Sequence, residues 1–271
     1  MRVGFGEMKK FNIFILSLLL ASFTSLASPC ICRAEILSGN VNKEEFLEKS
    51  HIVVDGATGN PVVGAEVSVP SEGIFTKTNN SGQFKLDASF KAPAILSVQA
   101  SGYSPFSLTI NETGNPLVIV VTKLFGNEII IDSEIHHLGD DNFSEKSANA
   151  GDFKLESEGA GFSKEFFVEK FDTKSNPALK IGAVIGIDTK ISHKVEGKKI
   201  KTYSSPMRIY INSKKIGEIK INADNQEISL PKGILKQNSA NTIRIETGVN
   251  QQARTYVDYD DMEFMNILLA F

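Results

Sequence analysis

The stretch VVDGATGNPVVGAEVSV, from Val53 to Val69, places a turn between two short runs of β-branched residues. Its central segment, DGATGNP, combines residues that tolerate positive φ with a proline that fixes φ. The run after the turn alternates with a period of two. The stretch therefore predicts that one strand ends near Asp55 and that a second begins near Ala65.

Short extended runs separated by turn residues continue on the C-terminal side of this stretch. The segment TNNSG (78–82) is a second turn signal, and a bend at Gly102 is followed by Tyr103. A period of two recurs, whereas the helical period of 3.6 does not. The runs expected as strands are HIVV, AEVSV, IFTKT, QFKLD, AILSVQA, FSLTI and LVIVV. Turns at this density predict an all-β sandwich.

Four segments of this part carry a resemblance to a known family. VVDGATGNPVVGAEVSV, TKTNNSGQFKL, LSVQASGYSPF and LVIVV follow one another in this order. Residues 51–123 thereby resemble the carboxypeptidase regulatory-like domain, a transthyretin-like Greek-key sandwich grouped with carbohydrate-binding-like folds, and the domain is expected to span 51–124. Each matching residue is a turn or core position, so the resemblance implies a scaffold and no activity.

Residues 125–271 predict a second sandwich. Alternating runs extend from FKLESEGAGFSKEFFVEKF through ALKIGAVIGID, MRIYINSKKIGEIKI, ISLPKGIL and NTIRIETG to DYDDMEFMNILLAF. Their spacing and the length of this half suit a jelly roll. The segments HHLGDDNF, IYINSKKIG and YDDMEF make this half similar to the galactose-binding-like jelly rolls of secreted bacterial proteins, which implies a carbohydrate-binding module.

The first 34 residues have the pattern of a secretory signal peptide. Lys9 and Lys10 precede an apolar run from Phe11 to Leu20, and small residues follow. Cleavage after Ala34 or after Ala27 fits this pattern. The alternative is an uncleaved membrane anchor, because the apolar stretch approaches spanning length.

Cleavage after Ala34 removes both cysteines, Cys30 and Cys32. On that reading the mature fold has no disulfide and no thiol chemistry. Residues 35–50 are expected to form a polar leader that carries at most one short helix. We expect a secreted, periplasmic or cell-envelope protein that meets a membrane only through an uncleaved leader.

Composition and motifs argue against several functions. The formal net charge is −3 and the pI is about 5.9, so the chain has no overall basic field for nucleic acid or for an anionic membrane. The sequence contains no GxSxG, HExxH, GxxxxGK[ST] or GxGxxG motif, so we expect no enzyme. His136 and His137 would lie on opposite faces of a strand, which favours a strand-end or solvent-exposed pair over a metal site.

Two acidic clusters form a candidate calcium site. Asp140 and Asp141 begin the second half, and Asp258 and Asp260 lie near its end, followed by Asp261 and Glu263. The first and last strands of the jelly rolls that this half resembles are neighbours, so the clusters could meet around a cation. The alternative is a solvated acidic loop, because alternation along the last strand would split the set. A catalytic carboxylate pair is the less favoured interpretation.

Sugar recognition usually depends on aromatic rings surrounded by a few polar groups. The chain has no tryptophan, which leaves tyrosines as the candidate platforms. We expect the ligand-binding residues to be Arg254, Tyr256, Asp258 and Tyr259.

The sequence thus predicts a non-catalytic protein of two β-sandwiches that binds carbohydrate or another polymer through the second. One alternative is a structural protein that binds other envelope proteins through strand edges or loops. A third hypothesis is a cell-envelope hydrolase that uses carboxylates.

Overall fold

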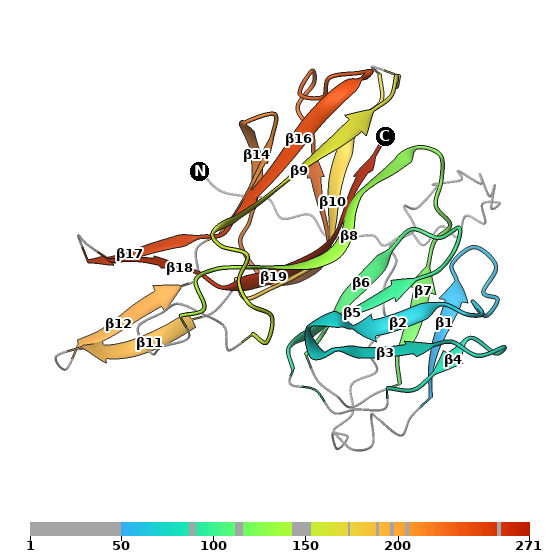
Figure 1. The fold of residues 1–271 in the computed structure, drawn as a ribbon, viewed down its shortest axis with the longest axis horizontal. Coiled ribbons are helices and arrows are strands. Elements are labelled where there is room, and N and C mark those ends of the chain that lie inside the picture. Colours follow the sequence, from blue (N-terminus) through green and yellow to red (C-terminus); the bar gives the residue numbers. More distant parts are fainter. Residues whose placement is uncertain are drawn as a thin grey trace, which may run out of the picture. The chain divides into compact units, whose positions relative to one another are not determined.

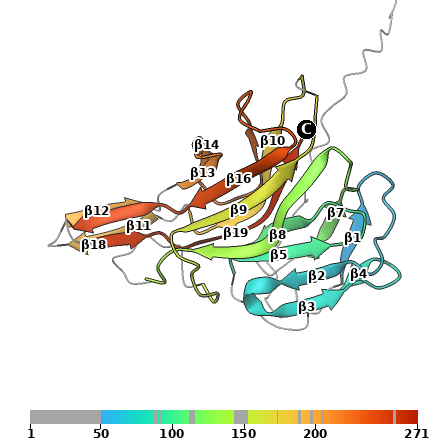
Figure 2. The ribbon, with the colours of Figure 1, turned by 45° about the horizontal axis from the view of Figure 1, so that its top comes forward.

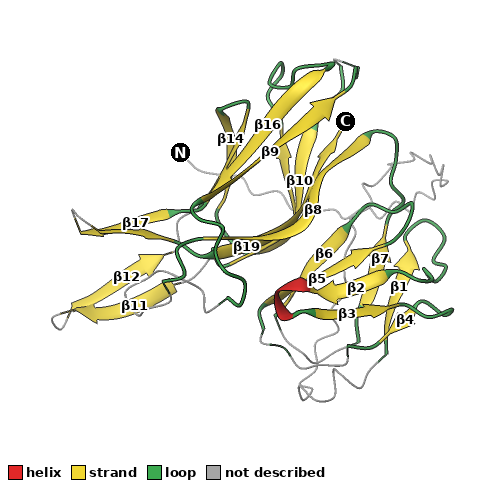
Figure 3. Cartoon of the chain, viewed as in Figure 1, coloured by secondary structure: helices red, strands yellow, loops and turns green. Residues whose placement is uncertain are grey.

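The computed structural model describes residues 50–86, 90, 92–111, 116–142, 153–172, 174–187, 190–195, 198–203, 206–253 and 256–271. The predicted signal peptide and all of the polar leader except Ser50 lie outside these residues. The described part contains 19 strands and one short 3-10 helix, η1 (Pro70–Glu72), and Figure 3 shows this division. The prediction of an all-β chain is confirmed.

The first sandwich consists of a three-stranded and a four-stranded sheet (Figure 1). The smaller sheet has the order β4-β1-β7 and the larger has the order β3-β2-β5-β6. Burial alternates along β1, β2 and β7, whereas nearly all residues of β5 and β6 are buried. Val53, Val67, Leu96 and Ile119 belong to one apolar core. The strands are β1 (His51–Asp55), β2 (Glu66–Val69), β3 (Ile74–Lys77), β4 (Gln83–Phe84), β5 (Ala94–Gln99), β6 (Phe106–Ile110) and β7 (Val118–Val121).

The turn predicted after β1 is present. The Asp55 carboxylate accepts hydrogen bonds from the backbone N–H groups of Ala57 and Thr58, at 2.9 and 2.8 Å, and Gly59 has a φ of 71°. The Tyr103 hydroxyl donates to the other oxygen of Asp55 at 2.8 Å. The turn after β1 is therefore held by a hydrogen bond from Tyr103, which follows the bend predicted at Gly102.

The second sandwich has the strand pairing of a jelly roll. One sheet has the order β15-β10-β19-β8, and the other has the order β14-β13-β16-β9. Among these eight strands the first pairs with the last, the second with the seventh, the third with the sixth and the fourth with the fifth, all antiparallel. The strands are β8 (Glu128–Leu138), β9 (Gly161–Val168), β10 (Ala178–Ile185), β13 (Met207–Ile211), β14 (Lys214–Ile219), β15 (Ala223–Ser229), β16 (Ser239–Glu246) and β19 (Met262–Ala270).

Two hairpins are inserted into this jelly roll. The pair β11 (Lys190–Val195) and β12 (Lys198–Tyr203) connects β10 to β13, and the pair β17 (Val249–Ala253) and β18 (Tyr256–Tyr259) connects β16 to β19. Both leave the sandwich at the same end in the two views of Figures 1 and 2. The connection between β8 and β9 begins at this end as well.

The two sandwiches pack against each other. Ile95 of β5 lies in a buried apolar cluster with Ala183, Ile185 and Met265 of the second sandwich. Both the N–H and the hydroxyl of Thr109 in β6 donate to Asp224 in β15, at 2.9 and 2.7 Å. No helix in the described residues is long and apolar enough to span a membrane.

Candidate functional site

The first and last strands of the jelly roll are neighbours, as predicted. β8 and β19 pair in an antiparallel register that sets Leu138 opposite Met262 and His137 opposite Glu263. The residues that follow β8 therefore lie beside those that precede β19. This arrangement brings the two predicted acidic clusters together at one end of the sandwich.

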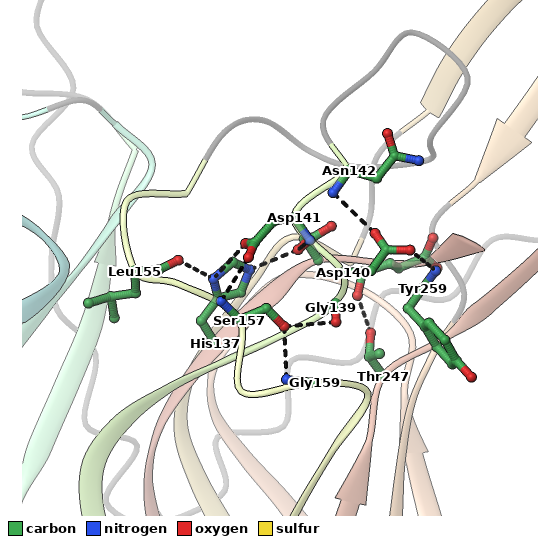
Figure 4. Close-up of polar contacts among 12 residues, drawn as sticks. His137, Gly139, Asp140, Asp141, Asn142, Leu155, Ser157, Gly159, Thr247 and Tyr259 are labelled. Carbon is green, nitrogen blue, oxygen red and sulfur yellow. Dashed lines mark hydrogen bonds and ion pairs between the residues drawn. The ribbon is translucent and has the colours of Figure 1, made fainter. Parts of the chain in front are cut away.

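A buried ion pair lies at the centre of this end (Figure 4). The imidazole Nε2 atom of His137 is 3.0 Å from Oδ1 of Asp261, and both side chains are fully buried. The Nδ1 atom of His137 is 2.5 Å from the main-chain oxygen of Leu155. Both neighbours are oxygen acceptors, so the ring must carry a proton on each nitrogen to bind both.

The charge of His137 follows from these contacts. Burial disfavours the charged ring, but the hydrogen bonds to Asp261 and Leu155 outweigh burial and raise the pKa of His137 above its ordinary value. The imidazolium therefore compensates the carboxylate of Asp261. A buried carboxylate without such a partner would be costly.

Gly139 makes room for Asp261. A Cβ atom at Gly139 would lie 2.1 Å from Oδ1 of Asp261, which is closer than any real contact. Because the position has no side chain, the carboxylate can lie against the backbone and accept the N–H of Asp141 at 2.9 Å. The glycine in the segment HHLGDD thus permits the ion pair.

The neighbouring aspartates bind the loop backbones. The Asp140 carboxylate accepts the N–H of Asn142 at 3.1 Å and the N–H of Tyr259 at 3.0 Å. Asp260 is buried, and its main-chain oxygen accepts the hydroxyl of Thr247. The acidic loop after β8 is therefore fastened to the segment that carries Tyr259.

The set of possible metal ligands differs from the predicted one. Among the described residues, His137, Asp141 and Asp261 have potential ligand atoms that all lie within 4.8 Å of one another. The predicted calcium ligands were Asp140, Asp141, Asp258 and Asp260, and only Asp141 belongs to both sets. The description of Asp258 stops at its backbone in β18. Calcium binding stays a prediction.

His136 lies on the other face of β8, as alternation predicted, but neither histidine is solvent-exposed. His136 stacks between Phe162 and Phe264, with ring centroids at 4.1 and 5.2 Å. Its Nδ1 atom is 3.0 Å from the Glu158 carboxylate. The pair lies at the end of β8, which agrees with the strand-end expectation. The other expectation, solvent exposure, was wrong because β8 is covered on both faces at this point.

A shallow pocket of about 370 Å³ lies on the outer face of the β9-β16-β13 sheet. The half-buried Tyr259 and the exposed Val249 form its border at the base of the β17–β18 hairpin. Strand residues that line it are Ser163, Arg208, Arg244 and Glu246. The pocket therefore combines an aromatic ring with hydroxyl, guanidinium and carboxylate groups.

Cross-strand register explains why these polar groups meet. Arg244 in β16 is opposite both Ser163 and Tyr210, and its guanidinium lies 4.0 Å from the centroid of the Tyr210 ring. In the adjacent row, Glu246 forms ion pairs with Arg208, at 3.6 Å, and with Arg244. The guanidinium groups are thus held in place over the sheet.

Hydrogen bonds connect the pocket to Asp140 and Asp260, which lie beside the buried ion pair. Arg208 donates to the main-chain oxygen of Thr247 at 3.0 Å, and Thr247 in turn donates to Asp260. The backbone of Tyr259 is held by Asp140, as described above. The contacts of Asp140 and Thr247 therefore fix the position of Tyr259, which forms one border of the pocket.

Of the four predicted ligand-binding residues, the structure places Tyr259 at the pocket. Arg254 lies outside the described residues, and the description of Tyr256 and Asp258 is limited to the backbone of β18. Sequence reasoning missed Arg208, Arg244 and Glu246, although the alternation in MRIYI and NTIRIE already places them on one face of each strand.

No family model matches the sequence, and no curated protein matches it.

Proposed function

We propose that this chain is a non-catalytic binding protein of the secreted or cell-envelope class, and that its jelly roll binds carbohydrate at the pocket beside Tyr259. The first sandwich serves as a scaffold of the carboxypeptidase regulatory-like type. The observation that carries the proposal is the pocket itself, which lies at a tyrosine expected to bind ligand.

The chemistry of the pocket suits a sugar. A pyranose ring has an apolar face that packs on an aromatic ring, and hydroxyl groups that need both donors and acceptors. Tyr259 offers the ring, Arg244 offers donors and Glu246 offers acceptors. The pocket is shallow, so we expect weak binding of a single sugar unit and stronger binding of a polymer with repeated contacts.

Preorganisation also favours this pocket. Arg244 lies on the Tyr210 ring and pairs with Glu246, so its guanidinium loses little freedom when a ligand arrives. The backbone at Tyr259 is also held in place: its N–H donates to Asp140, and the main-chain oxygen of the next residue, Asp260, accepts the hydroxyl of Thr247.

The experiment is a titration of the purified chain with a panel of soluble oligosaccharides, followed by the same titration of two variants. Tyr259→Ala removes the ring and is expected to weaken binding about three- to tenfold, as for loss of one aromatic contact. Tyr259→Phe keeps the ring and should bind within about twofold of the parent, which serves as the matched control. Equal affinity of all three proteins would show that Tyr259 takes no part.

Protein assembly is the second candidate, because two edge strands expose large aromatic side chains. Phe75 on β3 is 74% exposed and Phe167 on β9 is 56% exposed. Chains that use these edges should self-associate or bind an envelope partner, and Phe75→Ser or Phe167→Ser should abolish that association. Neither substitution should alter glycan binding.

A further inference from the structure

The β11–β12 hairpin concentrates positive charge in a chain whose net charge is negative. The twelve residues of its two strands include five lysines and no carboxylate. The formal net charge of the whole chain is −3. The negative net charge of the whole chain, which argued against anionic partners, therefore does not apply to this strongly basic hairpin.

Strand register separates the hairpin into two chemically different faces. Lys190 pairs with Tyr203, Ser192 with Lys201 and Lys194 with Lys199, and these alternate pairs share one face of the ribbon. The other face is formed by Ile191, Thr202, His193, Ile200, Val195 and Lys198. Four of the five lysines thus belong to one face, and the apolar residues belong to the other.

The charge pattern on the basic face does not stabilise the ribbon. Lys194 and Lys199 are directly opposite each other, and like charges in that arrangement are destabilising. Lys190 and Lys194 are four residues apart on one strand, which separates their Cα atoms by about 14 Å. A row of positive charge of this length fits an extended polyanion better than one small anion.

The hairpin and the pocket belong to the same end of the jelly roll. β12 is followed by β13, which supplies Arg208 to the pocket, and the β17–β18 hairpin supplies Tyr259. Figures 1 and 2 show the two hairpins extending from the sandwich in the same direction. A chain of sugars with one unit in the pocket could therefore extend along the β11–β12 hairpin.

We propose that the ligand is an acidic polysaccharide, of which one unit occupies the pocket beside Tyr259 while carboxylate or sulfate groups of further units bind the basic face of the β11–β12 hairpin. This inference rests on the carbohydrate-binding function proposed above and names its substrate class. An anionic membrane and a nucleic acid are the alternative polyanions, and the experiment below includes a probe for each.

The test compares binding of polygalacturonate, a polymer of uronic acid, with binding of neutral dextran. The variant Lys194→Gln with Lys199→Gln removes the two opposed charges without changing the length of either side chain greatly. The control variant, Lys170→Gln with Lys232→Gln, removes the same charge from two exposed positions outside the hairpin. Thermal unfolding checks folding, and relief of the Lys194–Lys199 repulsion should leave the midpoint of the hairpin variant equal or higher.

The expected result is that the parent prefers polygalacturonate to dextran, that added salt weakens this preference, and that the hairpin variant binds polygalacturonate about tenfold more weakly while the control variant does not. Equal binding by parent and hairpin variant would overturn the inference but leave the pocket proposal standing. Binding of neutral glycans but not of polygalacturonate would likewise overturn the inference and leave the pocket proposal standing. Absence of binding to any polysaccharide would contradict both proposals.

Two further probes examine the alternative polyanions. Phosphatidylglycerol vesicles and single-stranded DNA are titrated in the same buffer. Tighter lysine-dependent binding of either probe than of polygalacturonate would overturn the assignment to polysaccharide. Weaker binding of both supports it.

Discussion

The imidazole of His137 and the carboxylate of Asp261 meet 3.0 Å apart, across the first and last strands of the jelly roll. The second ring nitrogen of His137 faces the main-chain oxygen of Leu155, from the segment that leads into β9. One protonated ring thus connects three parts of the chain that are distant in sequence. Those parts also hold the loop that carries Tyr259.

Replacement of Asp261 by asparagine should release this connection. The amide keeps the shape of the carboxylate but lacks its charge, so two of the contributions that oppose burial are lost and the pKa of His137 should fall from its raised value. Loss of a hydrogen bond between charged groups should lower the free energy of unfolding by about 1.5–3 kcal/mol near pH 6. NMR titration of the His137 ring and urea unfolding measure the two effects.

Asp140→Asn is the control for this substitution. Asp140 accepts backbone N–H groups only, so an amide oxygen can still accept them. We expect a loss of less than about 1 kcal/mol and no change in the pKa of His137. If His137 titrates at the same pH in Asp261→Asn as in the parent, the ion pair does not set its charge.

Glu263 makes stability depend on pH. Its side chain is 1% exposed, and its Oε1 atom has no hydrogen-bond partner among the described residues. Burial raises the pKa of Glu263 to about 7; the charge of His137 opposes this rise, and the negative charge of Glu72 adds a smaller rise. Between about pH 4.5 and 7 the folded protein retains a proton that the unfolded chain releases, so stability should fall as the pH rises.

The raised pKa of His137 acts in the same direction at higher pH. Its contribution to stability is complete below the ordinary pKa of about 6.5 and is lost as the pH rises through the folded value. The protein should therefore be less stable at pH 8 than at pH 5.

Glu263→Gln separates the two effects. Glutamine stays neutral, so the variant should lose the dependence between pH 4.5 and 7 and should be more stable than the parent at pH 8, by about 2–3 kcal/mol. Urea unfolding at several pH values measures this difference. A parallel pH dependence in parent and variant would assign the effect to other groups.

Tyr103→Phe tests the bond that holds the opening turn. The Tyr103 hydroxyl is the largest cause, followed by the N–H of Thr58, of a shift that lowers the pKa of Asp55 to about 2. Asp55 thus contributes stability that is present above its ordinary pKa and is lost as the pH falls through about 2. The variant should raise the pKa of Asp55, and its acid unfolding should begin at a higher pH. Titration of the Asp55 carboxyl carbon by NMR gives the value, and Tyr210→Phe, which leaves Asp55 untouched, is the control.

Much of the fold could be predicted because local chemistry marks the strands. All seven runs expected in the first half became strands, and the Asp55 turn formed as its residues indicated. The spacing of the alternating runs and the length of the second half suited a jelly roll, but the pairing of the first strand with the last was expected only from the resemblance to jelly-roll modules. The inserted hairpin β11–β12 was not foreseen, because its period of two does not show whether it joins a sheet or stands as a separate ribbon.

The candidate site was less accessible to sequence reasoning. Alternation placed His136 and His137 on opposite faces correctly, but burial on both faces depends on Phe153 and Phe162, which arrive from the following segment. The meeting of Arg208 with Glu246 depends on the register between β13 and β16, which no local pattern encodes. Side chains that act together across strands therefore had to be found in the structure.

Backbone NMR of the labelled chain during titration with a glycan shows whether a sugar binds in the pocket beside Tyr259. If it does, the shifted amide signals should centre on Ser163, Arg208, Arg244 and Tyr259. A second depression of about 430 Å³, bordered by Glu66, Gln99 and Tyr103 of the first sandwich, serves as the internal comparison. Shifts centred there, or no shift with any glycan, would mean that the pocket beside Tyr259 does not bind a sugar.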